Sequence, residues 1–484
     1  MKAEKITNLD DFYVKKIREI SLREIIFCSP ETPVYEAAQI MKQEKISCLF
    51  VGNGINHLTG VVTDITLRDN VIANNYALDL PVSAIMDKEL VAIDQDAFVY
   101  EALLLMFRTK TRYLLVKDEN GFIGLTSRNK ILTEQSQSPF IFIQSVKQAI
   151  SREELKTKWE QVPEVVYQLI QRGVRAEIIN QIITAIADTI ALRVIENEIK
   201  EAGKPPAKFV FFILGSEGRK EQSLKTDQDN AIIYEDKANE HREIVRNYFL
   251  KFAAKVSDTL NFIGFNYCKG GFMASNPKWT HSLSHWKNNY ATWFQESSME
   301  TVMRYATFFD CRAIYGDFSL LDHLKAFMDQ QLQNPLERFF YNMAQNSLQY
   351  DTQLTWLKNI RTFEIDKQQV FDIKKAMSPM VDIIRLYALN QRIFETNTGK
   401  RLKILTHKEV FTEKEADELY QSYYYLMALR LEKQAESMII QGQLPQNYIK
   451  INTLTKVQVV TIREIFKVIK DLQLKIKIQF TKSF

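Results

Sequence analysis

Glycine, proline and cysteine are scarce in this sequence. Its 484 residues include 15 glycines, 11 prolines and 4 cysteines. Because glycine and proline punctuate turns and interrupt helices, their scarcity predicts long helices in preference to tightly turned β structure. The cysteines lie far apart and form no C-x-x-C pair, so the sequence indicates neither a disulfide framework nor a cysteine-based zinc site.

Long apolar runs and a strong excess of one charge are also missing. No stretch reaches the roughly 18 apolar residues of a membrane helix, and the N-terminus "MKAEKITNLDDFYVKK" has no apolar leader segment. The net charge is +4 with both signs interleaved, which by itself does not require nucleic acid. We expect a cytoplasmic protein without a membrane segment and, at this length, with about three domains.

Residues 21–135 contain an internal repeat. The segment "CSPETPVYEAAQIMKQEKISCLFVGNGINHLTGVVTDITLRD" is followed by "VAIDQDAFVYEALLLMFRTKTRYLLVKDENGFIGLTSRNKIL". Each copy has a polar turn, an amphipathic helix, a β-rich run and a second short strand that ends in hydroxyl residues. The repeat resembles a pair of cystathionine-β-synthase (CBS) domains, which form a pseudo-twofold module with clefts suited to adenine nucleotides.

In the CBS family, a hydroxyl residue and an aspartate three positions later hold the nucleotide ribose. The matching positions here are Thr63 with Thr66 and Ser127 with Lys130, so both aspartates are absent, although Asp64 lies nearby. We therefore expect adenylates to bind weakly at most. The alternative is a pair that serves homodimerisation or docking onto the rest of the chain.

The stretch "GSEGRKEQSLKTDQDNAIIYED" begins at Gly215, after the apolar run "KFVFFIL". Gly215 and Gly218 let backbone amides approach an anion, and Ser216 adds a hydroxyl donor. Asp227 and Asp229 should point to the same side of a strand end, where they repel each other unless a cation lies between them. Mg²⁺ prefers such oxygen ligands and shares its shell with substrate phosphates. The arrangement is typical of phosphoryl or nucleotidyl transfer.

The same stretch resembles the signature of the nucleotidyltransferases related to the amino-terminal catalytic domain of protein-PII uridylyltransferase, in the DNA polymerase β superfamily. The stretches "GFNYCKGGFMASNPKW", "FFDCRAIYGD" and "FDIKKAMSPMVDIIRLYAL" match this family too, and the last resembles its helical substrate-binding domain. The resemblance implies an α+β multidomain fold with a CBS pair, a polymerase-β-type mixed sheet with helices, and a C-terminal helical bundle. Residues 209–214 and 230–234 should be adjacent strands, with Gly215–Gly218 opening a helix between them.

Composition and resemblance together predict the domain boundaries. The expected divisions are an N-terminal helical lead (1–20), a tandem CBS pair (21–136), a helical connector (140–202), a nucleotidyltransferase domain (203–330) and a helical substrate-binding domain (335–484).

The resemblance implies roles for the residues of the motif. Gly215 and Ser216 would hold the triphosphate of an NTP, while Asp227 and Asp229 would bind Mg²⁺ and carry catalysis. Two cations in the same stretch, Arg219 and Lys225, are then expected to face phosphate charge.

Active members of the superfamily usually supply a third carboxylate from a later strand. The strand expected to carry it reads "FNYCKGG", with Cys268 near that position and no acid. Asp310 in "FFDCR" is the nearest downstream candidate. The alternative for Asp310 is a salt bridge to Arg312 or Arg304.

Five further residues belong to patterns that permit a site. The segment that resembles the substrate-binding domain contains Lys374, Arg385 and Arg401, which the resemblance implies would contact the cleft. In the alternative, two of these three residues serve ordinary surface or salt-bridge roles. His281 and His285 are four residues apart, but no Glu or Cys accompanies them at ligand spacing and tryptophans flank them, which favours packing over metal binding.

The favoured function is Mg²⁺-dependent transfer of an NMP from an NTP to an acceptor hydroxyl, regulated through the CBS pair, with a PII-like regulatory protein as the acceptor that the resemblance suggests. One alternative is a non-catalytic nucleotide-binding signalling regulator. A second is an RNA nucleotidyltransferase that uses the tail from Tyr448, where eight Lys and Arg residues stand against two acids. Such a run is more often a solvated face, so nucleic acid is not the expected partner.

Overall fold

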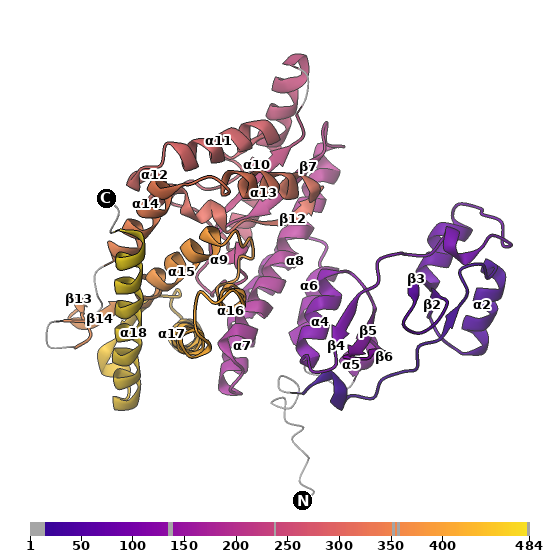
Figure 1. The fold of residues 1–484 in the computed structure, drawn as a ribbon, viewed down its shortest axis with the longest axis horizontal. Coiled ribbons are helices and arrows are strands. Elements are labelled where there is room, and N and C mark those ends of the chain that lie inside the picture. Colours follow the sequence, from indigo (N-terminus) through magenta and orange to yellow (C-terminus); the bar gives the residue numbers. More distant parts are fainter. Residues whose placement is uncertain (1–14, 134–138, 237–238, 351–353, 356–358, 482–484) are drawn as a thin grey trace, which may run out of the picture. The chain divides into compact units, whose positions relative to one another are not determined.

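The computed structural model describes residues 15–133, 139–236, 239–350, 354–355 and 359–481. Mixed sheets and long helices alternate along the chain, which confirms the α+β multidomain class (Figure 1). The contacts divide the chain into two units, Met1–Gln144 and Ser145–Phe484. The finer division of the second unit remains a prediction. Of the predicted N-terminal lead, residues 1–14 lie outside the described residues, and Ile17–Glu19 form one turn of 3-10 helix.

The first unit repeats one strand pattern twice. In each half, the first strand pairs in parallel with the second, and the second pairs antiparallel with the third. The helix of each half presents apolar residues at helical spacing, such as Val34, Ala37 and Met41, to the core beside the strands. The halves comprise β1 (Phe27–Cys28), α2 (Val34–Gln43), β2 (Cys48–Gly52) and β3 (Leu58–Thr63), then β4 (Ala92–Asp94), α4 (Val99–Arg108), β5 (Tyr113–Asp118) and β6 (Gly121–Ser127).

Long helices follow the first unit along the chain. Helix α6 (Pro139–Gln148) spans the boundary between the two units, and α7 (Arg152–Gln171) and α8 (Ala176–Ala202) belong to the second. Contrary to our expectation, α8 is long and apolar enough to meet the criterion for a membrane span, the one such helix among the described residues; 67% of its most apolar window is buried. It packs against α7, α10, α17 and β12. A largely apolar helix that is enclosed in this way is a core helix.

A four-stranded mixed sheet forms the centre of the second unit, in the order β11-β9-β7-β12. The predicted adjacency of the two apolar strands is confirmed, because β7 and β9 pair antiparallel and a short helix, α9, follows β7. The strands are β7 (Phe209–Ile213), β9 (Asn230–Tyr234), β11 (Thr280–Ser282) and β12 (Arg312–Gly316); β8 (Asp227–Gln228) and β10 (Asn266–Tyr267) form a separate parallel pair.

Helices cover both faces of the central strand. Alternation along β7 sends Phe209 toward Phe249 of α10 (ring centroids 5.0 Å apart) and Phe212 toward Trp286 of α11 (5.4 Å). All five residues of β7 are therefore buried. The helices in this part are α9 (Gly215–Gly218), α10 (Asn239–Ile263), α11 (Leu283–Gln295), α12 (Met299–Tyr305) and α13 (Ser319–Gln331).

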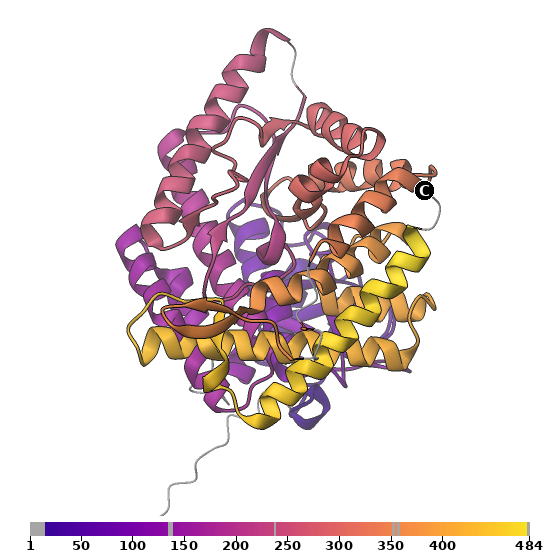
Figure 2. The same cartoon turned by 90° about the vertical axis from the view of Figure 1, so that its left-hand side faces the viewer.

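The C-terminal part is helical, as predicted, with one addition. Strands β13 (Phe363–Ile365), β14 (Gln368–Asp372) and β15 (Tyr448–Lys450) form a small antiparallel sheet that the helical pattern did not predict. The basic helix α18, yellow in Figure 2, packs its apolar stripe against α14, α15 and α17. The helices are α14 (Glu337–Leu348), α15 (Ile373–Asn390), α16 (Thr398–His407), α17 (Glu413–Ile439) and α18 (Lys456–Phe480).

Candidate active site

The two aspartates of the motif lie on one face of the chain because the residue between them is anchored on the other. The buried side chain of Gln228 donates hydrogen bonds from Nε2 to the carbonyl oxygens of Ser257 and Phe265, both at 2.9 Å. Alternation along an extended chain then turns Asp227 and Asp229 to the opposite, accessible side. The structure thus supports the predicted orientation of the pair.

The glycine turn lies beside this pair because β7 and β9 are antiparallel neighbours. The last residue of β7, Ile213, pairs with the first residue of β9, Asn230. The amide of Leu214 donates a hydrogen bond to the carbonyl of Asp229 at 2.9 Å. Gly215 follows with φ of +61°, and a Cβ there would lie 3.2 Å from Asp229 Oδ2. At Gly218 a Cβ would lie 2.0 Å from the carbonyl oxygen of Asp310. Both positions therefore require glycine, one for its conformation and one for the close approach of a second segment.

Asp229 is the more enclosed of the two carboxylates. Burial raises its pKa to about 6, and the neighbouring charge of Asp227 adds to this, while a hydrogen bond with Cys268 and the charge of Lys374 act in the opposite direction. Burial and the charge of Asp229 raise the pKa of the Cys268 thiol to about 11. At neutral pH the thiol therefore stays protonated and can donate to Asp229; Cys268 stands near the position where the resemblance led us to look for an acid.

Lys374, in the first turn of α15, acts on the same aspartate pair. Its side chain is exposed, yet the protein around it and the charge of Arg430 lower its pKa, while Asp227 and Asp229 favour its charged form. The helical part of the chain thus contributes a cation whose charge acts on the aspartate pair.

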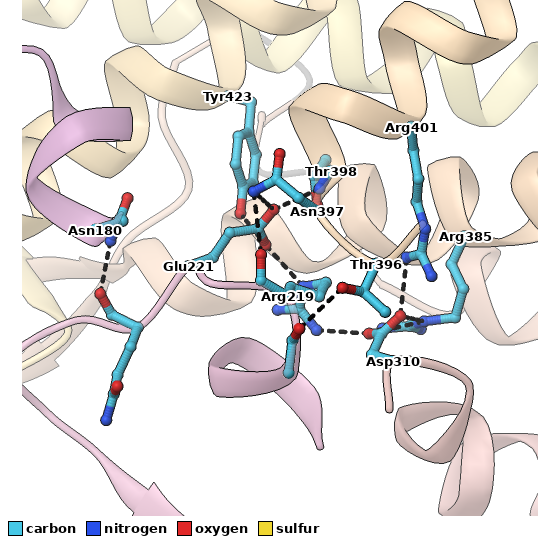
Figure 3. A network of polar contacts seen from close by, with 12 residues as sticks. Asn180, Arg219, Glu221, Asp310, Arg385, Thr396, Asn397, Thr398, Arg401 and Tyr423 are labelled. Atoms are coloured by element: carbon cyan, nitrogen blue, oxygen red, sulfur yellow. Dashed lines mark hydrogen bonds and ion pairs between the residues drawn. The ribbon is translucent and has the colours of Figure 1, made fainter. Parts of the chain in front are cut away.

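Asp310 lies in a buried cluster of arginines (Figure 3). Its carboxylate is 2.7 Å from Arg219 Nη1, 2.6 Å from Arg385 Nη2 and 2.8 Å from Arg401 Nη1. Burial alone would raise the pKa of Asp310, but Arg385, Arg401 and Arg219 outweigh it and hold the pKa well below the usual range. The carboxylate is occupied by these three partners, an arrangement that gives no support to a metal-binding role for it.

The expected salt bridge of Asp310 forms with different arginines from those we named. Arg312 instead binds Asp188 of α8 through two nitrogens, at 2.8 and 2.9 Å. The alternative of ordinary salt bridges fits Arg385 and Arg401, which are both buried.

A second carboxylate, Glu221, ties the motif to the C-terminal helices. Its Oε2 accepts hydrogen bonds from Arg219 Nε and from the Tyr423 hydroxyl, both at 2.7 Å, and its Oε1 accepts one from the Thr398 amide at 2.6 Å (Figure 3). Tyr423 lies on α17 and Thr398 begins α16. Arg219 is therefore held between Glu221 and Asp310, in place of the free position near phosphate that we expected. No local pattern could have identified Glu221, since its partner Tyr423 is 202 residues away.

The structure brings some of the predicted site residues together and separates others. Those gathered around the aspartate pair are Gly215, Ser216, Asp227, Asp229 and Lys374. Lys225 is exposed in the loop that leads into β8. Those drawn into the buried cluster are Arg219, Arg385, Arg401 and Asp310.

The histidine pair stacks on itself, with His281 half-buried and His285 exposed. The rings of His281 and His285 stack with centroids 3.6 Å apart, and burial together with His285 lowers the pKa of His281 to about 4. The flanking Trp279 and Trp286 stack on each other with centroids 6.1 Å apart. Among the residues that the structure describes, no group of three or more His, Cys, Asp or Glu side chains is arranged to hold a metal ion.

Glu217 of the motif is an additional buried acid that the pattern of the sequence did not single out. Its side chain is 7% exposed, and burial, followed by the charges of Asp188 and Asp229, raises its pKa from 4.5 to about 8, against the opposing effect of Arg312. At neutral pH the folded protein therefore holds Glu217 in its protonated form.

This burial predicts a pH-dependent stability. Between about pH 4.5 and pH 8 the folded protein retains a proton on Glu217 that the unfolded chain releases, so the free energy of unfolding falls as pH rises through this window. Glu217→Gln, which is neutral at every pH, should match the wild type near pH 4.5 and be more stable by a few kcal/mol at pH 8, since each pKa unit corresponds to about 1.4 kcal/mol. Urea unfolding at both pH values measures the difference. The exposed Glu243→Gln is the control, and a difference that is equal at both pH values would contradict the prediction.

In the first unit, the hydroxyl positions of the CBS resemblance are engaged locally. Thr63 and Thr66 cap the turn after β3 reciprocally, with each side chain hydrogen-bonded to the other's amide at 3.1 and 3.2 Å. The nearby carboxylate of Asp64 forms an ion pair with Arg112 of the second half. The side chains nearest to the missing ribose aspartate are therefore already partnered.

Comparison with known families agrees with this geometry. Residues 160–300 match the family described as "Putative nucleotidyltransferase DUF294", residues 337–480 match "Putative nucleotidyltransferase substrate binding domain", and residues 17–72 and 82–136 match the CBS domain. The chain combines a CBS pair with a DUF294-type nucleotidyltransferase domain and its substrate-binding domain, which confirms the resemblance.

Similar proteins cover about a quarter of the chain. A 17.7 kDa protein of Acidianus ambivalens is 30% identical over 22% of this chain and 63% of its own length, and an inosine-5'-monophosphate dehydrogenase of Methanocaldococcus jannaschii is 32% identical over 25% of this chain and 23% of its own. The chain thus spans less than two thirds of the length of either relative. Among solved structures, a conserved protein from Pyrococcus horikoshii is 23% identical with a TM-score of 0.24, covering 26% of this chain and 95% of that one. A CBS domain protein from Pyrobaculum aerophilum complexed with AMP is 19% identical with a TM-score of 0.23, covering 25% and 99%.

Proposed function

We propose that the second unit transfers an NMP from an NTP to an acceptor hydroxyl with the help of Mg²⁺. The observation that carries the proposal is the pair of carboxylates, Asp227 and Asp229, which share one accessible face beside the Gly215–Ser216 turn. Neither carboxylate has a side-chain cation within ion-pair distance among the described residues, so their oxygens fit a hard divalent ion. When bound, Mg²⁺ would supply positive charge that offsets the charge of the substrate phosphates.

The proposed reaction is a nucleotidyl transfer. The acceptor hydroxyl oxygen attacks the α-phosphorus of the NTP, the new P–O ester bond forms, and the bond to the β-phosphate breaks to release pyrophosphate. The hydroxyl proton passes to solvent. Backbone amides at Gly215 and the Ser216 hydroxyl would orient the phosphates, and the exposed Lys225 would meet them from the loop before Asp227. For Arg219 we propose a positioning role, because Glu221 and Asp310 already hold its guanidinium group.

One feature favours a second candidate, a nucleotide-binding regulator that does not turn over. The place of the usual third acid is taken by Cys268, whose protonated thiol cannot accept a proton from the attacking hydroxyl at neutral pH. Such a protein would bind NTP and metal and signal their presence through its CBS pair.

The CBS pair is proposed to regulate the second unit and to form homodimers. Because Thr66 caps its own turn and Asp64 is paired with Arg112, we expect at most weak adenylate binding there. A PII-like regulatory protein is the acceptor suggested by the family resemblance. The RNA alternative has less support, since α18 packs its apolar stripe inward and two of its lysines pair with glutamates, Lys467 with Glu464 and Lys475 with Glu415.

A labelling experiment tests these functions. The full chain is incubated with Mg²⁺, a cell extract and each α-labelled NTP in turn, and both the label in macromolecules and the released pyrophosphate are measured. We expect one NTP to label a protein with matching pyrophosphate release. Binding of NTP without pyrophosphate release would favour the regulator, label that ribonuclease removes would favour RNA transfer, and no binding of any NTP would contradict both the transferase and the regulator.

A further inference from the structure

Arg430 of α17 is a buried cation without an ion-pair partner. Its side chain is 6% exposed, and its one hydrogen bond runs from Nε to Asn447 Oδ1 at 3.0 Å. No carboxylate among the described residues lies within ion-pair distance of it, and its two terminal nitrogens have no partner there. Burial lowers its pKa to about 10 and the charge of Arg219 adds to this, although Tyr423 and Asp372 act in the opposite direction. A guanidinium group in this setting lacks the paired anion that normally compensates its loss of water.

The position of Arg430 on its helix aims it at the nucleotidyltransferase motif. Tyr423, Arg430 and Gln434 lie on one face of α17, at spacings of seven and four residues. The residues on either side of Arg430 both bind the motif loop: Tyr423 donates to Glu221, and Gln434 Oε1 accepts from the Leu224 amide at 3.1 Å. Arg430 therefore faces the same loop, which leads directly into the aspartate pair.

Lys374 joins Arg430 in this region. Lys374 lies in the first turn of α15, which packs against α17, the helix of Arg430. Desolvation by the surrounding protein, followed by the charge of Arg430, lowers the pKa of Lys374, in keeping with this packing. Asp227 and Asp229 act on the same lysine, because their negative charges favour its charged form. The helical part thus supplies two cations that lack a paired anion of their own, and the sheet supplies two carboxylates that lack a paired cation.

We propose that Arg430 and Lys374 bind the β- and γ-phosphates of the NTP, so that the nucleotide spans both parts of the second unit. The inference rests on the proposed function and deepens it. A polyphosphate supplies the anion that both cations lack, and arginine offers a planar fork that binds phosphate oxygens in pairs. During transfer the same two residues would stabilise the negative charge that develops on the leaving pyrophosphate. The nucleotide site then depends on the docking of α15 and α17 onto the motif loop.

The proposal is tested by measuring how the affinity of the protein depends on the number of phosphates in the ligand. Affinities of the full chain for NTP, NDP, NMP and inorganic tripolyphosphate are measured by calorimetry for the wild type, Arg430→Met, Arg430→Lys and Lys374→Met. We expect Arg430→Met and Lys374→Met to bind NTP and tripolyphosphate about 10- to 100-fold more weakly, as loss of a charged hydrogen bond implies, with NMP affinity nearly unchanged. Arg430→Lys should lie between them and the wild type.

Matched controls separate phosphate binding from a structural role. Lys375→Met removes an exposed lysine one position along α15, and Arg392→Met removes an exposed arginine; both should bind tripolyphosphate like the wild type. If Arg430→Met fails to fold, Lys374→Met carries the test, since that side chain is exposed. Unchanged tripolyphosphate affinity in Lys374→Met and Arg430→Lys would overturn the inference. Wild-type protein that binds tripolyphosphate through these residues but transfers no nucleotide would overturn the proposed function and leave the inference standing.

Discussion

Replacing Asp227 and Asp229 together with asparagine should abolish Mg²⁺-dependent NTP binding without unfolding the protein. The two carboxylates share one face and Asp229 is partly enclosed, so burial and the charge of Asp227 both disfavour its ionised form. Removing both charges should therefore leave the stability of the metal-free protein unchanged or slightly raised. Nucleotidyl transfer, in contrast, should fall by about 100-fold or more, because the carboxylates are the proposed metal ligands.

Thermal melting with and without Mg²⁺-NTP measures both effects. The wild type should gain stability by mass action, about 2.7 kcal/mol when the ligand is at 100 times its Kd, while the double variant gains much less. Asp329→Asn, at an exposed ion pair with Arg392, is the control for the substitution itself. If the aspartates instead cap a backbone amide, the variant would lose about 1 kcal/mol in the metal-free state and would still respond to ligand like the wild type. That pattern would rule out the metal site.

Asp310→Asn should be the most destabilising single change in the second unit. The carboxylate is fully buried and lies within 2.8 Å of nitrogens from Arg219, Arg385 and Arg401. An asparagine would leave three buried guanidinium groups around a neutral amide. We expect the free energy of unfolding to fall by about 3–5 kcal/mol, the usual cost of breaking a buried ion pair from one side.

Urea unfolding followed by tryptophan fluorescence checks this expectation. Asp329→Asn again serves as control, since its pair with Arg392 is solvent-exposed and should contribute no more than about 1 kcal/mol. A loss of stability at Asp310 as small as that of the control would mean that the arginine cluster does not hold the helices to the sheet. If Asp310→Asn kept the stability of the wild type but lost Mg²⁺ binding, Asp310 would be a metal ligand after all.

The two predictions concern two kinds of residue. Local chain geometry determines the orientation of Asp227 and Asp229, whereas packing of distant segments determines the partners of Asp310. Asp227 and Asp229 are adjacent to their strand, their turn and the buried Gln228, so alternation of side chains was sufficient to orient them. The partners of Asp310 are not local: Arg385 is 75 residues away along the chain, and Arg219 is 91. Which arginine reaches a buried carboxylate depends on which helices pack there.

The sequence by itself determined the α+β class, the CBS repeat, the strand–turn–strand order of the motif and the shared face of its two aspartates. The α+β class followed from the family resemblance, and the other features from periodicity and from the conformational needs of a few neighbouring residues. Only the tertiary structure decided that Arg219 is held by Glu221 and Asp310, that α8 is a core helix, and that α17 binds the motif loop through Tyr423 and Gln434. These outcomes depend on contacts between segments far apart in the chain, where burial selects the ion pairs, and burial is fixed only when the helices have packed on the sheet.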